Sequence, residues 1–168
     1  METIYLNGTA CHTYGSLPRI GEKAPAFKLT TPDLGEIELN DFRGKTVVLN
    51  IFPSLDTSVC ATSVRRFNAE ASKLPDTQVI CVSMDLPFAA KRFCTAEGID
   101  NLIVASAFRS PMFAQKYGVE IVDGPLTGLL ARSVVVIDPK GTVAYTELVN
   151  EITTEADYNA ALRIIKES

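Results

Sequence analysis

From Thr46 onward, the chain alternates between short apolar runs and longer amphipathic stretches, and this alternation limits the folds that it can adopt. The apolar runs are rich in β-branched residues, which predicts buried strands, while the stretches between them repeat apolar residues at helical spacing. We predict strands at 46–52, 78–83, 102–105, 133–137 and 142–146, and helices at 58–74, 87–97, 110–117 and 155–166. Strands separated by helices require crossover connections, which cover both faces of a sheet. The sequence therefore predicts an α/β fold with a central sheet flanked by helices.

Turn signals predict two hairpins before this regular region. Asn7 and Gly8 lie between two short strand-prone runs within residues 2–14. Asn-Gly between such runs is typical of a tight turn, so we expect an N-terminal β-hairpin. Runs 27–29 and 37–39 alternate around a proline- and glycine-containing turn and predict a second hairpin.

Two further signals concern the C-terminal third. The segment 138–141, Asp-Pro-Lys-Gly, separates the last two predicted strands and favours their antiparallel pairing, which makes the predicted sheet mixed. Residues 154–157 match a capping box, in which the first and last side chains bond each other's backbone N–H groups, and this predicts the start of the final helix.

Length and charge limit the possible partners. A chain of 168 residues is long enough for one domain with its own core. The formal net charge is −4, with acidic and basic residues interspersed, so no basic patch for nucleic acid or for a membrane surface is visible. The N-terminus lacks the features of a secretory signal, and no apolar run reaches the roughly 18 residues of a membrane span. We expect a single domain, 1–168, in the cytoplasm.

Cys60 is the residue that most directly indicates a chemistry. It follows an apolar strand, the turn residue Pro53 and a cluster of N-cap residues that includes Thr57. Cys60 is therefore predicted in the first turn of a helix, where free backbone N–H groups and the helix dipole stabilise a negative charge. A thiol in this position is a candidate nucleophile.

A helix terminus alone stabilises a thiolate only modestly, so a cation is expected nearby. The candidates are Arg132, at the entry to the strand 133–137, and Arg65 and Arg66 on the helix of Cys60. The site must also stabilise charge on a substrate atom, and Thr57 and backbone N–H groups could do so.

The other cysteines divide into one candidate and two packing residues. Cys94 lies in the predicted helix 87–97 and could condense with an oxidised Cys60, provided that the two Cα atoms approach within about 7 Å. If both cysteines start on intact helices, one segment must unwind. Cys81 is predicted as a core residue of a strand, and Cys11 as packing of the N-terminal hairpin.

Several other chemistries lack their usual residues. The sequence has no Cys-x-x-Cys, and Cys11 with His12 would be awkward ligands beside distant cysteines, which argues against zinc. His12 is the only histidine, which argues against a cysteine hydrolase with a histidine base. No glycine-rich phosphate loop is present.

With these residues identified, the chain resembles the bacterial thiol peroxidases, a two-cysteine subfamily of the peroxiredoxins with a thioredoxin-like fold. The pattern Pro-x-x-x-Thr-x-x-Cys is matched by Pro53, Thr57 and Cys60, and the second cysteine on the following helix narrows the resemblance to this subfamily. The resemblance covers nearly the full length and includes the runs 50–60, 85–88, 92–94, 123–126 and 131–138.

The resemblance implies a role for each motif residue. Cys60 would be the peroxidatic thiolate, which attacks hydrogen peroxide or an alkyl hydroperoxide and becomes a sulfenic acid. Thr57 would orient the peroxide, Arg132 would stabilise the thiolate and polarise the O–O bond, and Pro53 would shield the pocket from water. Cys94 would be the resolving thiol that forms an intramolecular disulfide with Cys60.

The resemblance also implies partners. Thioredoxin would reduce the disulfide, the protein would form a homodimer near the active site, and no bound cofactor is expected because the cysteines carry the electrons. Two other interpretations remain open at this point. Cys60-Ala-Thr-Ser63 also fits a monothiol glutaredoxin-like thiol-disulfide exchanger. Alternatively, the same cysteine pair could serve a non-enzymatic redox sensor or binding module.

Overall fold

The fold was obtained as a computed structural model that describes residues 1–167. The strands are β1 Thr3–Leu6, β2 Thr9–His12, β3 Lys28–Thr30, β4 Glu36–Glu38, β5 Thr46–Ile51, β6 Thr77–Ser83, β7 Ile103–Ser106, β8 Ser133–Ile137 and β9 Val143–Leu148. The helices are the 3₁₀ helix η1 Leu39–Phe42 and the α-helices α1 Ser58–Ala71, α2 Pro87–Glu97, α3 Pro111–Lys116 and α4 Tyr158–Glu167.

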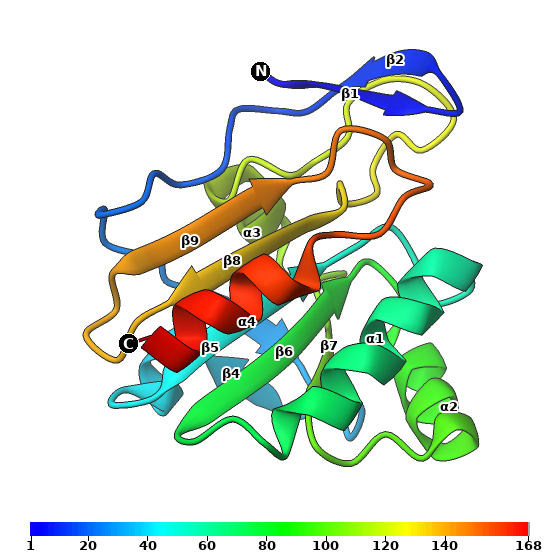
Figure 1. The fold of residues 1–168 in the computed structure, drawn as a ribbon. Coiled ribbons are helices and arrows are strands. Elements are labelled where there is room, and N and C mark those ends of the chain that lie inside the picture. The colour runs from blue at the N-terminus through cyan, green and yellow to red at the C-terminus, as the bar shows by residue number, and fades with distance from the viewer. Residues whose placement is uncertain (168) are drawn as a thin grey trace.

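Seven of these strands form one mixed sheet in the order β4-β3-β7-β6-β5-β8-β9 (Figure 1). The strands β5, β6 and β7 are parallel to one another, and α1 and α2 are the crossovers between them. The strand β8 pairs antiparallel with both β5 and β9. This topology confirms the predicted α/β fold and places β5, which leads to Cys60, at the centre of the sheet.

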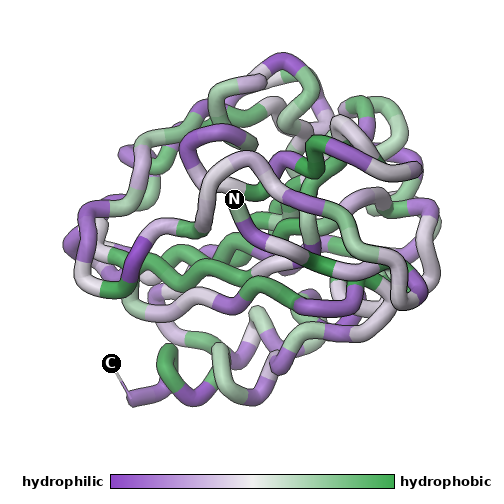
Figure 2. The backbone as a smooth tube through the Cα atoms, turned by 90° about the horizontal axis from the view of Figure 1, so that it is seen from above, coloured by the Kyte–Doolittle hydropathy of each residue, from purple (hydrophilic) through white to green (hydrophobic). Residues whose placement is uncertain are grey.

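The sheet separates two apolar clusters, as expected from strands with apolar residues on both faces. On one face, α1 and α4 pack against alternate residues of the central strands, including Val48, Val134 and Val136. On the other face, α3 and the N-terminal region pack against the residues between them, such as Val47 and Leu49. Figure 2 shows hydrophobic residues along the central strands and hydrophilic residues at the outer turns.

Both predicted hairpins are present. In the first, β1 and β2 pair antiparallel, and Asn7 and Gly8 have φ of 51° and 83°. Two successive positive φ values characterise the type I′ turn that the Asn-Gly signal predicts. The second hairpin, β3 with β4, joins the edge of the main sheet through Thr30, which pairs with Ser106 of β7.

Two predicted helix boundaries are wrong. The helix predicted at 58–74 ends at Ala71, because Leu74 precedes Pro75 and a residue before proline disfavours helical dihedrals. The helix predicted at 155–166 begins three residues later, at Tyr158. There Asp157 takes the capping role, since its Oδ1 accepts a 3.0 Å hydrogen bond from the N–H of Ala160.

Within residues 1–167, every helix is too short or too polar to cross a membrane.

Candidate active site

Cys60 lies at the junction of the central strand and the helix that covers it. The strand β5 ends at Ile51, the chain turns through a loop over residues 53–57, and α1 begins at Ser58. Thr57 is the extended N-cap residue and its carbonyl accepts the first helical hydrogen bond, from Ala61 at 3.0 Å. Cys60 is thus the third residue of α1, as predicted, and its side chain is fully buried.

The loop residues Pro53 and Thr57 differ in exposure. Pro53 is buried, whereas Thr57 is exposed. The Thr57 hydroxyl donates a 3.0 Å hydrogen bond to the carbonyl oxygen of Ser54, and the Thr57 N–H points to the same oxygen at 3.3 Å. The single proton of this hydroxyl is therefore already used in a hydrogen bond, so the hydroxyl oxygen can only accept a hydrogen bond from a ligand.

The three arginines considered as partners of Cys60 lie in different surroundings. Arg65 is exposed and makes a two-point ion pair with Glu97 of α2, at 2.7 and 3.1 Å. Arg66 is exposed as well and lies over the ring of Tyr158, at 5.0 Å from its centroid. Only Arg132 is buried, with 3% of its surface exposed.

Two nitrogens of the Arg132 guanidinium, Nε and Nη1, differ in their hydrogen bonding. Its Nε donates a 2.8 Å hydrogen bond to the carbonyl oxygen of Ile152, while its Nη1 is buried without a partner among the described residues. Arg132 precedes β8 directly, and Ser133 of β8 is in register with Ile51 at the end of β5. The sheet therefore brings this guanidinium to the edge from which the Cys60 loop departs.

A second unsatisfied polar atom, the hydroxyl of Tyr158, is buried near Arg132. Burial raises the pKa of Tyr158 to about 12, although Ser63 and the charges of Arg132 and Arg66 act in the opposite direction. Ser63 lies one turn after Cys60, and its Oγ donates a 2.8 Å hydrogen bond to the Cys60 carbonyl oxygen. Arg132, Tyr158 and Ser63 therefore gather behind the first turn of α1.

Cys94 lies on α2 and is a free, half-buried thiol. It packs against the same apolar cluster as Cys60, and burial raises the pKa of its thiol. The structure thus brings both cysteines to one face of the sheet, on separate intact helices and without a disulfide. This is the arrangement in which one segment would have to unwind before a bridge could close.

The remaining cysteines are buried, as predicted. Cys81 of β6 accepts a 3.5 Å contact from Asn50 Nδ2, and burial raises its pKa to about 12. Cys11, in β2 of the N-terminal hairpin, is 2% exposed. The only histidine, His12, is engaged with Asp123, with its Nδ1 2.6 Å from the carboxylate. Within the described chain, His, Cys, Asp and Glu nowhere gather in a group of three that could hold a metal ion.

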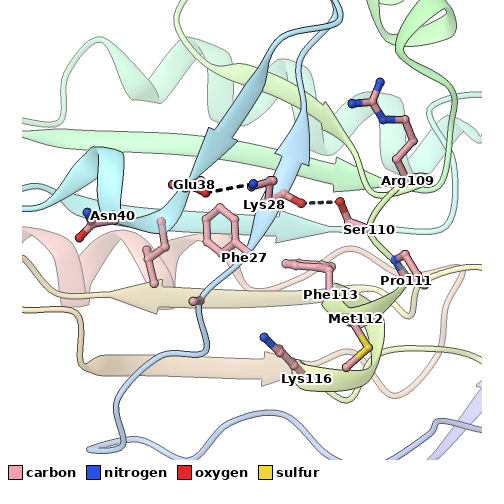
Figure 3. Close-up of a pocket in the computed structure, with 12 residues that line it drawn as sticks. Phe27, Lys28, Glu38, Asn40, Arg109, Ser110, Pro111, Met112, Phe113 and Lys116 are labelled. Carbon is pink, nitrogen blue, oxygen red and sulfur yellow. Dashed lines mark hydrogen bonds and ion pairs between the residues drawn. The ribbon is translucent and has the colours of Figure 1, made fainter.

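A separate cavity of about 460 Å³ lies between β3, η1 and α3, away from all five predicted site residues (Figure 3). Phe27, Met112 and Phe113 give it an apolar side, and Lys28, whose ammonium group is 3.4 Å from Glu38, also lines it. Its lining includes none of Pro53, Thr57, Cys60, Cys94 and Arg132.

Sequence reasoning missed three residues near Cys60. The sequence predicts Tyr158 only as a residue of the final helix. Ser54 and Asp85 lie in runs that carry the family resemblance, yet no sequence rule pairs them. In the structure the Asp85 carboxylate accepts hydrogen bonds from Ser54 Oγ at 2.9 Å and from the Leu55 N–H at 2.8 Å. Only the fold brings these segments, 30 residues apart in the chain, together.

Comparison with known proteins shows the family of the chain. The Redoxin family model matches residues 19–162. The thiol peroxidase of Mycobacterium tuberculosis is 59% identical over 162 residues, which cover 96% of this chain and 97% of that protein. The thiol peroxidase of Corynebacterium glutamicum is 53% identical over 162 residues, covering 96% and 98% of the two chains.

Solved structures show the same similarity. A peroxiredoxin-like protein from Aquifex aeolicus has a TM-score of 0.94 and 41% identity, covering 99% of this chain and 97% of its own. A thiol peroxidase from Chromobacterium violaceum, at 22% identity, shares the fold with a TM-score of 0.88. These findings confirm the resemblance drawn from the Pro-x-x-x-Thr-x-x-Cys pattern. The chain therefore belongs to the Redoxin family and, within it, to the thiol peroxidases.

Proposed function

We propose that this peroxidase reduces hydrogen peroxide and alkyl hydroperoxides through Cys60, with Cys94 as the resolving thiol and thioredoxin as the reductant. The observation that carries the proposal is the position of Cys60, buried as the third residue of α1 just after a proline-containing loop. The N–H groups of the first helical turn have no partner within the helix, and the helix dipole favours negative charge there. A thiolate is the species that attacks a peroxide.

Two polar groups predicted for the site suit the two ends of a hydroperoxide. The Thr57 oxygen, whose proton is held by Ser54, can accept the O–H of the peroxide. The unpartnered Arg132 Nη1 is a donor available to the charge that develops on the sulfur and on the departing oxygen. Pro53, buried in the loop that leads into α1, would limit access of water.

The chemistry balances in two steps. The Cys60 thiolate attacks one peroxide oxygen, the O–O bond breaks, and one proton is taken up, which gives a sulfenic acid and water or an alcohol. The Cys94 thiol then attacks the sulfenic sulfur, and water leaves as the Cys60–Cys94 disulfide forms. Two thiols of thioredoxin would reduce this disulfide by exchange. Burial raises the pKa of the Cys94 thiol, which disfavours its thiolate form while α2 is folded.

The assembly and location belong to the same proposal. The exposed side chains of Leu86 and Phe88 lie at the start of α2, where a second copy of the chain could cover them in a homodimer. Free cysteines at all four positions suit a reducing compartment such as the cytoplasm. Sedimentation equilibrium of the wild type and of a Phe88→Asp variant tests the dimer.

Mass spectrometry of the reduced protein, seconds after one equivalent of cumene hydroperoxide, tests the reaction. We expect the mass to fall by two hydrogen atoms and peptide mapping to find the Cys60–Cys94 bridge. Unchanged thiols would refute the peroxidase proposal and favour the thiol-disulfide exchanger. A stable oxygen adduct on Cys60 alone would retain the peroxidase and remove Cys94 from it. Rapid oxidation without reduction by thioredoxin would favour the redox sensor.

A further inference from the structure

We propose that the Asp85 carboxylate is a positioning residue for peroxide reduction, because it holds the loop that presents Thr57 and Cys60. This inference rests on the proposed function of Cys60. Asp85 follows β6 and immediately precedes Leu86, the N-cap residue of α2. It lies neither in the Cys60 loop nor on α1.

The Asp85 carboxylate accepts three hydrogen bonds from two segments. Its Oδ1 accepts from Ser54 Oγ at 2.9 Å, and its Oδ2 accepts from the Leu55 N–H at 2.8 Å. The same Oδ2 accepts from Ser83 Oγ at 2.7 Å, and the Asp85 N–H returns a 3.3 Å bond to that hydroxyl. Ser83 is buried in β6, paired with Ser106 of β7, so the carboxylate is fixed from the sheet side.

The hydrogen bonds continue from Ser54 to the site. Ser54 Oγ also accepts the Asp56 N–H at 3.1 Å, while the Ser54 carbonyl oxygen accepts both the hydroxyl and the N–H of Thr57. Thr57 is the N-cap of α1. A continuous series of hydrogen bonds therefore leads from the sheet through Asp85 and Ser54 to the Thr57 hydroxyl that would receive the peroxide. Without the Asp85 carboxylate, this series is no longer attached to the sheet.

The position of Asp85 also links the two cysteine helices. Its carboxylate holds the entry to α1, while its backbone leads directly into α2, which carries Cys94. A displacement of the start of α2 would pull on the loop before Cys60. The same carboxylate would thus align the thiol for the first step and transmit movement of α2 in the second.

A pair of variants separates hydrogen-bond geometry from charge. Asp85→Ala removes all three acceptor contacts. Asp85→Asn can keep all three contacts, with its amide oxygen toward Leu55 and Ser83 and its NH₂ donating to Ser54 Oγ. Asp56→Asn is the matched control. Asp56 lies in the same loop, but its carboxylate is exposed and makes a long ion pair with Arg92, at 3.8 Å.

The test compares two reactions of Cys60 in the reduced protein by stopped flow. Reduction of cumene hydroperoxide needs alignment, whereas alkylation by iodoacetamide needs only an accessible thiolate. We expect Asp85→Ala to slow the peroxide reaction by about 100-fold, the scale of a displacement near 1 Å. Its alkylation should slow by less than about threefold or accelerate, because a loosened loop exposes the thiol. Asp85→Asn should stay within about fivefold and Asp56→Asn within about twofold of the wild type for both reactions.

Other results would overturn the proposal. A folded Asp85→Ala protein that reduces peroxide within twofold of the wild-type rate would exclude a positioning role, and so would a parallel loss of both reactions. If Asp85→Ala does not fold by circular dichroism, Ser54→Ala decides the question: we expect at least a fivefold slower peroxide reaction, and a change below twofold would overturn the inference. If the wild-type protein does not react with peroxide, the proposed function is refuted. Hydrogen exchange of the Leu55 amide in Asp85→Asn and Ser54→Ala would still show whether the contacts of Asp85 with Ser54 and Leu55 hold the loop.

Discussion

The two helices that carry Cys60 and Cys94 are of similar length but differ in how many of their residues are buried. The helix α1 buries six residues over 58–71, among them Val64 and Phe67, against the central strands. The helix α2 buries only Pro87 and Ala90 over 87–97. Elements with few buried contacts open more readily. A disulfide between the two cysteines is therefore expected to form by unwinding of α2, while α1 keeps the nucleophile in place.

Substitution of the two cysteines should have the largest effect on the reaction with peroxide, and it tests the different roles of α1 and α2. Cys60→Ser should reduce peroxide consumption to background, because a serine hydroxyl is not ionised at neutral pH. Cys94→Ser should react with the first peroxide equivalent within about threefold of the wild-type rate, since a resolving thiol acts only after the O–O bond breaks. Its turnover with thioredoxin should be lost. Stopped-flow reduction of cumene hydroperoxide, followed by steady-state assays, measures both quantities, and normal turnover in Cys94→Ser would contradict the division of roles.

The difference in anchoring predicts a difference in stability. Phe67 is 1% exposed and meets the ring of Tyr158 edge to face at 5.3 Å, so Phe67→Ala should cost about 3–5 kcal/mol of the free energy of unfolding. Phe93 of α2 is only half-buried, and Phe93→Ala should cost about 1–2 kcal/mol. Urea unfolding at neutral pH measures both. Equal losses would mean that α2 is held as firmly as α1.

These helices also show what sequence patterns can and cannot predict. The bounds of α2 follow from Pro87 at its start and Gly98 after its end, and the structure reproduces them. The position of Cys60 in α1 was predictable for the same local reason. Arg132 could be named as a candidate, yet only the register of β8 on β5 brings it to the site.

The features that the sequence did not predict depend on contacts between residues far apart in the chain. The partner of Asp85 is 30 or more residues away, and local periodicity carries no information about such pairs. The start of α4 was misplaced because two polar residues, Thr154 and Asp157, could each cap a helix. Tertiary contacts decided between them, with Tyr158 buried against Phe67.

The thiols of α2 and of the sheet should differ in reactivity. Burial raises the pKa of both, but Cys81 is fully buried with a pKa of about 12, whereas Cys94 is half-buried. Because the thiolate is the reactive form, alkylation of Cys94 by iodoacetamide at pH 8 should exceed that of Cys81 by at least about tenfold. Peptide mapping of the native, reduced protein gives both rates, and denatured protein, in which the two should react alike, is the control. Comparable labelling in the native state would show that β6 opens as easily as α2.

The smallest expected effect concerns the ion pair between the two helices. Glu97 of α2 receives two hydrogen bonds from Arg65 of α1, and this lowers the pKa of its carboxyl group below the usual 4.5. A lowered carboxyl pKa stabilises the folded state above the unfolded pKa, and this stabilisation is lost as the pH falls through the folded value. Glu97→Gln should therefore lower the urea midpoint at pH 7, and this difference from the wild type should shrink as the pH falls through the lowered pKa of the wild-type carboxyl group.

The same substitution should loosen α2 where Cys94 lies. Because exposed ion pairs contribute little, the Cys60–Cys94 bridge should form faster by a factor below about five in Glu97→Gln after one equivalent of peroxide. Glu70→Gln is the matched control, since Glu70 pairs with Lys73 at 3.6 Å and does not reach α2. Quenched-flow alkylation and mass spectrometry follow the bridge. An unchanged or slower rate in Glu97→Gln would mean that the step limiting disulfide formation does not detach α2 from α1, and the unwinding would then have to be sought at the loop before Cys60.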